Sequence, residues 1–126
     1  MTAAELGREG ERVATAFLEG KGYRLMDQNY RFEREEVDLV MFEPTPADDG
    51  GEIVFVEVKA RRGTGFGRPE DAVDAAKQKA IRRVAEAWLH ERKLFPSPVR
   101  FDVVAVLFDR GEPTVEHFEN AFGYFG

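Results

Sequence analysis

The chain has 126 residues, of which 43% are hydrophobic and 33% charged, and it carries a formal net charge of −6 at pH 7. This length predicts one domain that spans residues 1–126 and has a core of its own. The chain has no cysteine, which excludes disulfides and cysteine-ligated zinc and fits a reducing compartment. No segment approaches the roughly 20 apolar residues that cross a bilayer, and the N-terminal residues lack a signal-peptide core. We therefore expect a cytoplasmic protein without a membrane partner.

The first half of the chain predicts one helix and three strands. Residues 3–19 place apolar and small residues at helical spacing, and Gly20 and Gly22 then supply a stop signal. Three strand-like segments follow: residues 23–28, 30–42 and 52–60. Residues 43–51 are rich in Pro, Asp and Gly, so we expect a loop between the second and third strands.

The second half predicts a loop, a helix and a final pair of strands. Residues 61–68 include Gly63, Gly65 and Gly67 and predict a mobile loop. A helix is predicted from about Asp74, its N-cap, to Arg92, and a start at Pro69 is the alternative. Two strands follow it, over residues 99–108 and 114–118.

The order of these elements predicts an α/β fold. Short connections favour an antiparallel meander for the first three strands. The fourth strand follows a helix, so we expect it to return parallel to the third through a right-handed crossover. The result is a central mixed sheet of four to five strands flanked by two helices.

Basic residues gather in one part of this acidic chain. Between Lys59 and Arg83 there are eight basic and three acidic residues, a local charge of +5. The overall acidity argues against indiscriminate binding to nucleic acid, whereas the local excess favours contact with phosphates. The alternative interpretation is a solvated helix face beside a polar loop.

Two predicted strands carry charge within apolar runs, namely residues 37–40 with Asp38 and residues 56–59 with Glu57 and Lys59. Burying an ion costs several kcal/mol unless it is paired or bound to a metal. Alternate strand residues share a face, so Glu57 and Lys59 lie together. The other face of this strand, with Val54, Val56 and Val58, is predicted to be buried, and Asp38 shares its face with Glu36 and Val40.

These charges predict a divalent-metal site. Opposed side chains on neighbouring strands approach within about 5 Å, which lets two carboxylates share one ion. Asp38, Glu57 and the carbonyl of Val58 offer the oxygen ligands that Mg²⁺ or Mn²⁺ prefers. Lys59 would then stabilise an attacking hydroxide. The alternative is a cross-strand salt bridge between Lys59 and either acid that only neutralises charge.

Three further acids stand out. Glu11 follows Gly7 and Gly10 in the first predicted helix, and glycines so placed indicate the close approach of another backbone or a ligand. The alternative for Glu11 is an ordinary exposed helical glutamate. Asp102 lies in an apolar run and predicts a structural partner for a basic side chain, while the role of Glu36 stays open.

In combination, these residues resemble the small bacterial YraN-like family, from about Leu6 to Phe122. The resemblance is carried by Gly7-x-x-Gly10-Glu11, Glu36-Val37-Asp38-Leu39-Val40, Phe55-Val56-Glu57-Val58-Lys59-x-Arg61, Phe66-Gly67, Lys77 and Arg100-Phe101-Asp102-Val103-Val104. That family is assigned to the PD-(D/E)XK nuclease-like superfamily, which is related to Holliday-junction resolvases and restriction endonucleases. The sequence departs from the family at Glu35, where a glycine is usual.

The resemblance implies a single nuclease-like domain with a restriction endonuclease-like sheet. It implies metal-ligand roles for Asp38 and Glu57, a catalytic lysine at Lys59 and an accessory acid at Glu11, with the helix led by Lys77 flanking the site. DNA is the implied partner, and related resolvases often act as dimers. The family is largely uncharacterised, so the resemblance names no substrate.

The leading hypothesis is a Mg²⁺- or Mn²⁺-dependent DNA endonuclease that acts on branched or repair-intermediate DNA. Four basic residues would hold the flanking phosphates: Arg61, Arg62, Arg68 and Lys77. Two alternatives are a non-catalytic nucleic-acid-binding module and a protein-interaction domain with a partner in DNA processing. The first alternative predicts DNA binding that is indifferent to divalent metal, and the second predicts none at physiological salt.

Overall fold

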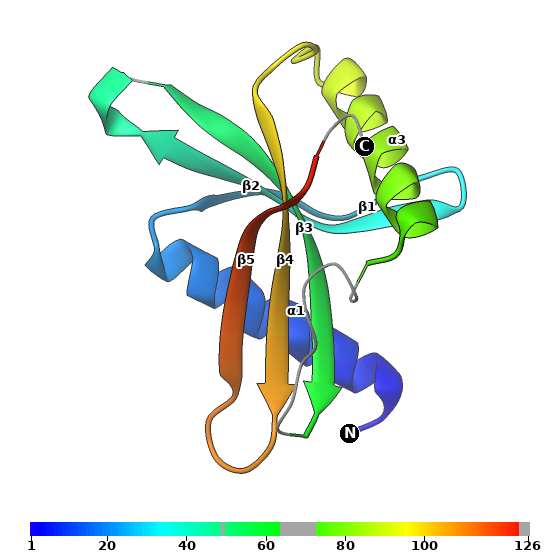
Figure 1. Ribbon diagram of the computed structural model, residues 1–126, viewed down its shortest axis with the longest axis vertical. Helices are drawn as coiled ribbons and strands as arrows, with labels where there is room; N and C mark the ends of the chain where they lie inside the picture. The colour runs from blue at the N-terminus through cyan, green and yellow to red at the C-terminus, as the bar shows by residue number, and fades with distance from the viewer. Residues whose placement is uncertain (49, 64–72, 124–126) are drawn as a thin grey trace.

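The computed structural model describes residues 1–48, 50–63 and 73–123 (Figure 1). Its elements in chain order are α1 (Ala3–Gly20), β1 (Arg24–Phe32), β2 (Glu35–Thr45), the 3-10 helix η1 (Pro46–Asp48), β3 (Gly50–Arg62), α3 (Ala75–Glu91), β4 (Val99–Phe108) and β5 (Thr114–Phe122). The predicted loop over residues 61–68 is only partly described: Arg61 and Arg62 extend β3, and residues 64–72 lie outside the described residues.

The five strands form one mixed sheet in the order β1-β2-β3-β4-β5. Pairing is antiparallel from β1 to β3 and between β4 and β5, and parallel between β3 and β4. The sheet twists strongly, so that β1 and β2 cross the view while the lower parts of β3, β4 and β5 run down it (Figure 1). The predicted α/β class, the meander and the parallel return of the fourth strand are confirmed.

Each face of the sheet is covered by one helix. On one face, Ala14 and Leu18 of α1 pack into a core that includes Leu39 and Val56. On the other, α3 packs its buried stripe, which includes Trp88, into a core that includes Phe55 and Phe101. Strands buried on both faces read as continuous apolar runs.

This double burial corrects one sequence expectation about β3. We expected one buried face, formed by Val54, Val56 and Val58. In the structure Val54 and Val56 are buried and Val58 is partly buried, and Ile53, Phe55 and Glu57 on the second face are buried too, because α3 covers that face. Glu57 is therefore an acid within the core rather than at an open sheet surface.

Both helices begin where the sequence predicts. Thr2 and Glu5 form a capping box at the start of α1, and the side chain of Asp74 accepts a hydrogen bond from the Lys77 N–H at the start of α3. The alternative start at Pro69 falls outside the described residues.

Three strand boundaries differ from the sequence expectation. Residues 43–51 are mostly not a loop, because β2 and β3 stay paired as far as Thr45 and Gly50, with η1 between them. Residues 30–32 belong to β1, and a tight turn follows in which Glu33 adopts a φ of 58°. The last strand continues to Phe122 because it stays paired with β4 as far as Phe101.

Candidate metal centre

The candidate site lies where β2 separates from β3. The antiparallel pairs of these strands run from Thr45 opposite Gly50 to Leu39 opposite Val56. At the next step Asp38 Oδ2 accepts a hydrogen bond of 2.8 Å from the backbone N–H of Val58. A side-chain oxygen thus serves a strand N–H, and the Asp38 carboxylate is held between the two strands.

Glu57 places a second carboxylate beside Asp38, and one of its oxygens is unsatisfied. The Glu57 side chain is 8% exposed, and its Oε1 lies 3.9 Å from the Nζ of Lys59. Its Oε2 is buried and has no hydrogen-bond partner among the described residues. A buried carboxylate oxygen without a partner is costly, so this atom favours a bound cation.

The Asp38 and Glu57 carboxyl groups affect each other's ionisation in opposite senses: Glu57 raises the pKa of Asp38, whereas a side-chain hydrogen bond with Asp38 acts to lower the pKa of Glu57. Burial, and then the negative charge of Glu57, raise the pKa of Asp38 to about 7, although the Val58 N–H acts in the opposite direction. Burial also raises the pKa of Glu57, while the positive charges of Lys77 and Lys59 oppose this shift. Without a cation the pair therefore retains a proton near neutral pH.

Helix α1 brings Glu11 to the same place. A Cβ built on Gly10 would lie 2.6 Å from the Cβ of Ala60, so the missing side chain lets the helix lie close against β3. Burial raises the pKa of Glu11; a hydrogen bond from Asn29 opposes this, and the charges of Asp38 and Glu36 add to it. The close approach predicted from the glycines is found at Gly10 only, because nothing lies within 4 Å of a Cβ built on Gly7.

Asn29 was not predicted as a site residue from the sequence, and the role of Glu36 was open. Asn29 Nδ2 donates to Glu11 Oε1 at 3.0 Å and to Glu36 Oε1 at 2.9 Å. Arg31 also donates to Glu36, over 3.4 Å. Asn29 adopts a φ of 50°, and asparagine is among the few residues that tolerate this conformation. Its place between two predicted strands was the available signal.

The predicted basic residues are only partly near this centre. Arg61 and Arg62 are exposed at the end of β3, where the Arg62 guanidinium donates to the carbonyl of Met1. Lys77 lies in the first turn of α3, and its charge acts on Glu57. Arg68 falls outside the described residues.

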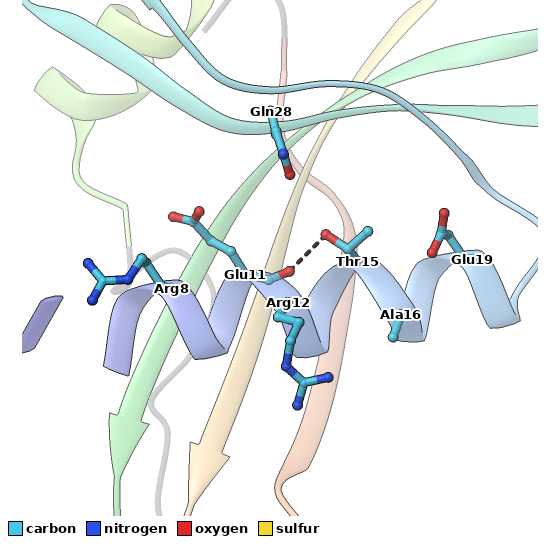
Figure 2. Close-up of a pocket in the computed structure, with 7 residues that line it drawn as sticks. All are labelled: Arg8, Glu11, Arg12, Thr15, Ala16, Glu19 and Gln28. Atoms are coloured by element: carbon cyan, nitrogen blue, oxygen red, sulfur yellow. Dashed lines mark hydrogen bonds between the residues drawn. The ribbon is translucent and has the colours of Figure 1, made fainter. Parts of the chain in front are cut away.

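A groove of about 350 Å³ adjoins the site between α1 and β1 (Figure 2). Its lining residues are Arg8, Glu11, Arg12, Thr15, Ala16, Glu19 and Gln28. Glu11 projects from α1 toward the strands above it in this view. Glu11 therefore belongs both to the groove and to the group of acids around Asp38, whereas Asp38 and Glu57 do not line the groove. Among the described residues, no group of three or more His, Cys, Asp or Glu side chains is placed so that it could hold a metal ion, so any ion here would rest on the Asp38–Glu57 pair and backbone or water oxygens.

Asp102 lies elsewhere and has the structural role that its sequence context predicts. It is fully buried and accepts hydrogen bonds from the Arg100 guanidinium at 2.8 Å and from the backbone N–H of Asn120 at 2.9 Å. His117 Nε2 lies 2.7 Å from Asp102 Oδ2. Burial would raise the pKa of Asp102, but these hydrogen bonds outweigh it and hold the pKa below the ordinary value.

Comparison with known proteins gives one consistent family. The model of the uncharacterised protein family UPF0102 matches residues 10–106, a range that contains the candidate site. A UPF0102 protein of Renibacterium salmoninarum is 44% identical over 117 residues, covering 92% of this chain and 94% of the relative. Those of Rhodococcus opacus and Geotalea uraniireducens are 44% and 42% identical over 118 residues, each covering 93% of this chain and 95% and 88% of the relative. In the part of the chain that the structure describes, no helix is long and apolar enough to cross a membrane.

Proposed function

The chain belongs to the uncharacterised protein family UPF0102, and we propose that it is a metal-dependent DNA endonuclease of the PD-(D/E)XK, restriction endonuclease-like type. The family name assigns no activity, and the support for this function lies in the residues of the candidate site. The observation that carries it is Glu57, whose buried Oε2 has no hydrogen-bond partner among the described residues.

The residues at this point suit a hard divalent cation such as Mg²⁺ or Mn²⁺. Such ions prefer carboxylate and carbonyl oxygens and retain several waters. Asp38, Glu57 and the carbonyl of Val58 would hold the ion, and Glu11 adds negative charge beside Asp38. A purely structural salt bridge is a weaker explanation. Lys59 is 3.9 Å from Glu57 Oε1, and this contact leaves Oε2 unsatisfied.

In phosphodiester hydrolysis, the residues around the ion would have separate roles. When bound, the ion polarises the scissile phosphate and lowers the pKa of its water. Lys59 presents a positive charge next to Glu57 and would stabilise the charge that develops on the attacking oxygen. The charge of Lys77 acts on Glu57 in the same sense as that of Lys59. Arg61, Arg62 and Arg68 would hold phosphates without reading base sequence.

A paired measurement of metal binding and cleavage tests the proposal. We expect Mn²⁺ titrated by calorimetry to bind the wild type but not Asp38→Asn, which keeps an acceptor for the Val58 N–H while removing the charge. Asp109→Asn, in the exposed turn after β4, is the control and should bind as the wild type does. Branched, duplex and single-stranded DNA should then be incubated with each protein in Mg²⁺ or Mn²⁺.

Each outcome favours one hypothesis. Cleavage that requires Asp38 and Glu57 supports the endonuclease, with branched and repair-intermediate DNA as the substrates to test first. Absence of cleavage on all three DNA forms, or a Glu57→Ala variant as active as the wild type, would overturn it. Salt-sensitive DNA binding that ignores divalent metal would instead indicate a binding module, and no DNA binding would indicate a protein-interaction domain.

A further inference from the structure

Asn29 occupies a position in β1 that no catalytic motif assigns. In the β1–β2 register, Gln28 pairs with Leu39 and Tyr30 pairs with Val37, so Asn29 lies across from Asp38. Its φ of 50° is left-handed, a conformation that costs most residues free energy and that Asn tolerates. The backbone thus turns the Asn29 side chain toward the acids of the candidate centre.

The side chain of Asn29 joins two carboxylates from different elements. Nδ2 donates at 3.0 Å to Glu11 of α1 and at 2.9 Å to Glu36 of β2. Ionised carboxylates only accept hydrogen bonds, so Glu11 and Glu36 cannot bond to each other, and their charges repel. A neutral group with two donors holds them together without bringing a positive charge that would compete with a metal ion.

The contact is not needed to attach α1 to the sheet. Ala14 and Leu18 bury their side chains in the core beneath this helix, and Gly10 lies directly against Ala60. The Asn29 contacts lie on the exposed side of the helix–sheet interface. Their effect is therefore on where the Glu11 carboxylate points rather than on whether the helix packs.

We propose that Asn29 is a positioning residue of the metal centre, which fixes the Glu11 carboxylate beside Asp38 so that α1 adds negative charge next to the Asp38–Glu57 pair that would hold the ion. The inference rests on the proposed function, because it assigns Asn29 a part in the same site. Residues that orient metal ligands typically change metal affinity by about 10- to 100-fold when they are replaced.

The Asn29→Gly variant tests the side-chain amide separately from the backbone conformation. Glycine adopts a positive φ without strain, so the variant keeps the turn of the chain and loses only the two donors. The matched control is Asn120→Gly on β5 at the opposite edge of the sheet, where Asn120 has a φ of 52°. We expect Asn29→Gly to weaken Mn²⁺ binding by about tenfold or more, and the control to bind as the wild type does, with equal thermal midpoints.

A double-mutant cycle with Glu11→Gln asks whether Asn29 acts through Glu11. In the Glu11→Gln background, we expect Asn29→Gly to change Mn²⁺ affinity by less than about twofold, since residues that work through one contact are not additive. Full additivity, or an Asn29→Gly variant that binds Mn²⁺ as tightly as the wild type, would overturn the inference.

A spectroscopic readout on the metal-free protein separates this inference from the proposed function. The side-chain amide signals of Asn29, identified by their loss in Asn29→Gly, should shift in both Glu11→Gln and Glu36→Gln. Signals that ignore both substitutions would overturn the positioning role even in a protein that binds Mn²⁺. Signals that respond in a protein that binds no Mn²⁺ would overturn the proposed function, and with it the part of Asn29 in a metal centre.

Discussion

Among single residues, Glu57 and Asp38 work against the stability of the metal-free fold. Both carboxyl groups are largely buried, burial raises the pKa of each, and the charge of Glu57 raises the pKa of Asp38 further. We expect Glu57→Gln to stabilise the metal-free protein at pH 8 by about 1–2 kcal/mol, because the amide has nearly the shape of the carboxylate but carries no charge that must be buried. Urea denaturation in EDTA measures this, with Glu116→Gln on the exposed side of β5 as the control.

The stabilisation expected from Glu57→Gln should depend on pH. The folded-state pKa of Asp38 is raised to about 7, so its unfavourable charge acts fully above pH 7 and fades as Asp38 takes up a proton at lower pH. The advantage of Glu57→Gln should therefore shrink between pH 8 and pH 6. A variant that is less stable than the wild type at pH 8 would contradict this account.

Asp102 has the opposite linkage, because its folded-state pKa is held below the ordinary value. The stability that it contributes is present above pH ~4 and is lost as pH falls through its lowered pKa. We expect Asp102→Asn to lower the free energy of unfolding by about 3 kcal/mol at pH 7, since it leaves the Arg100 guanidinium without the buried carboxylate that it contacts. The difference from the wild type should narrow in urea titrations near pH 3, and a constant difference would argue against an ionised Asp102.

How far the site could be predicted from the sequence depends on the residue. Asp38, Glu57 and Lys59 were visible because charge interrupts apolar strands, and Glu11 because of the neighbouring glycines. Asn29 was not, because its place between two predicted strands reveals neither its positive φ nor its hydrogen bonds to Glu11 of α1 and Glu36 of β2. Composition and spacing carry no trace of that contact.

Among the elements, the contact of α1 with β3 decides where Glu11 lies. A side chain at Gly10 would need space that Ala60 occupies, since the two Cβ atoms would be 2.6 Å apart. We expect Gly10→Ala to cost about 1–3 kcal/mol of folding stability by overpacking, and to weaken Mn²⁺ binding by moving Glu11. Chemical denaturation and calorimetry measure the two effects.

The same helix offers a control and a rescue for that prediction. A Cβ on Gly7 meets nothing within 4 Å, so Gly7→Ala should be neutral or stabilise the helix by up to about 1 kcal/mol. Adding Ala60→Gly to Gly10→Ala frees the contested space and should recover Mn²⁺ affinity. Equal effects of the Gly7 and Gly10 substitutions would show that the close approach is unimportant.

Element types were predictable because strong periodicity and capping residues mark both helices and the apolar runs mark the strands. The ends of β2 and β3 were not. Residues 43–51 have the composition of a loop, yet cross-strand pairing carries both strands to Thr45 and Gly50. A Cβ on Gly51 would lie 2.2 Å from the ring of Phe42, so this glycine makes room for a neighbouring strand rather than for a turn.

The whole molecule has a negative net charge, and part of this charge is concentrated at the candidate centre. The chain carries −6 overall, and the acids Glu11, Glu36, Asp38 and Glu57 lie near enough for their charges to act on one another's pKa values. DNA phosphates should therefore be repelled until a cation is bound. We expect DNA affinity, measured by fluorescence anisotropy at constant ionic strength, to rise by about tenfold or more when Ca²⁺ replaces EDTA.

The charge argument also predicts the effect of removing an acid. Glu57→Gln should bind DNA more tightly than the wild type in EDTA and should lose most of its response to Ca²⁺. Glu116→Gln, which removes one charge far from the centre, should retain the full response. A Ca²⁺ response that is equal in all three proteins would indicate general screening instead of a specific ion.

One residue, Asp38, belongs both to the architecture and to the proposed metal centre, since its Oδ2 accepts a hydrogen bond from the Val58 N–H where β2 separates from β3. Truncating this side chain to remove the proposed metal ligand would also remove the hydrogen bond that links β2 to β3 at this point. A variant that lacks the charge but keeps the fold must carry an amide at position 38. Homologues that lose activity while they are selected to stay folded should therefore carry Asn at this position more often than Ala.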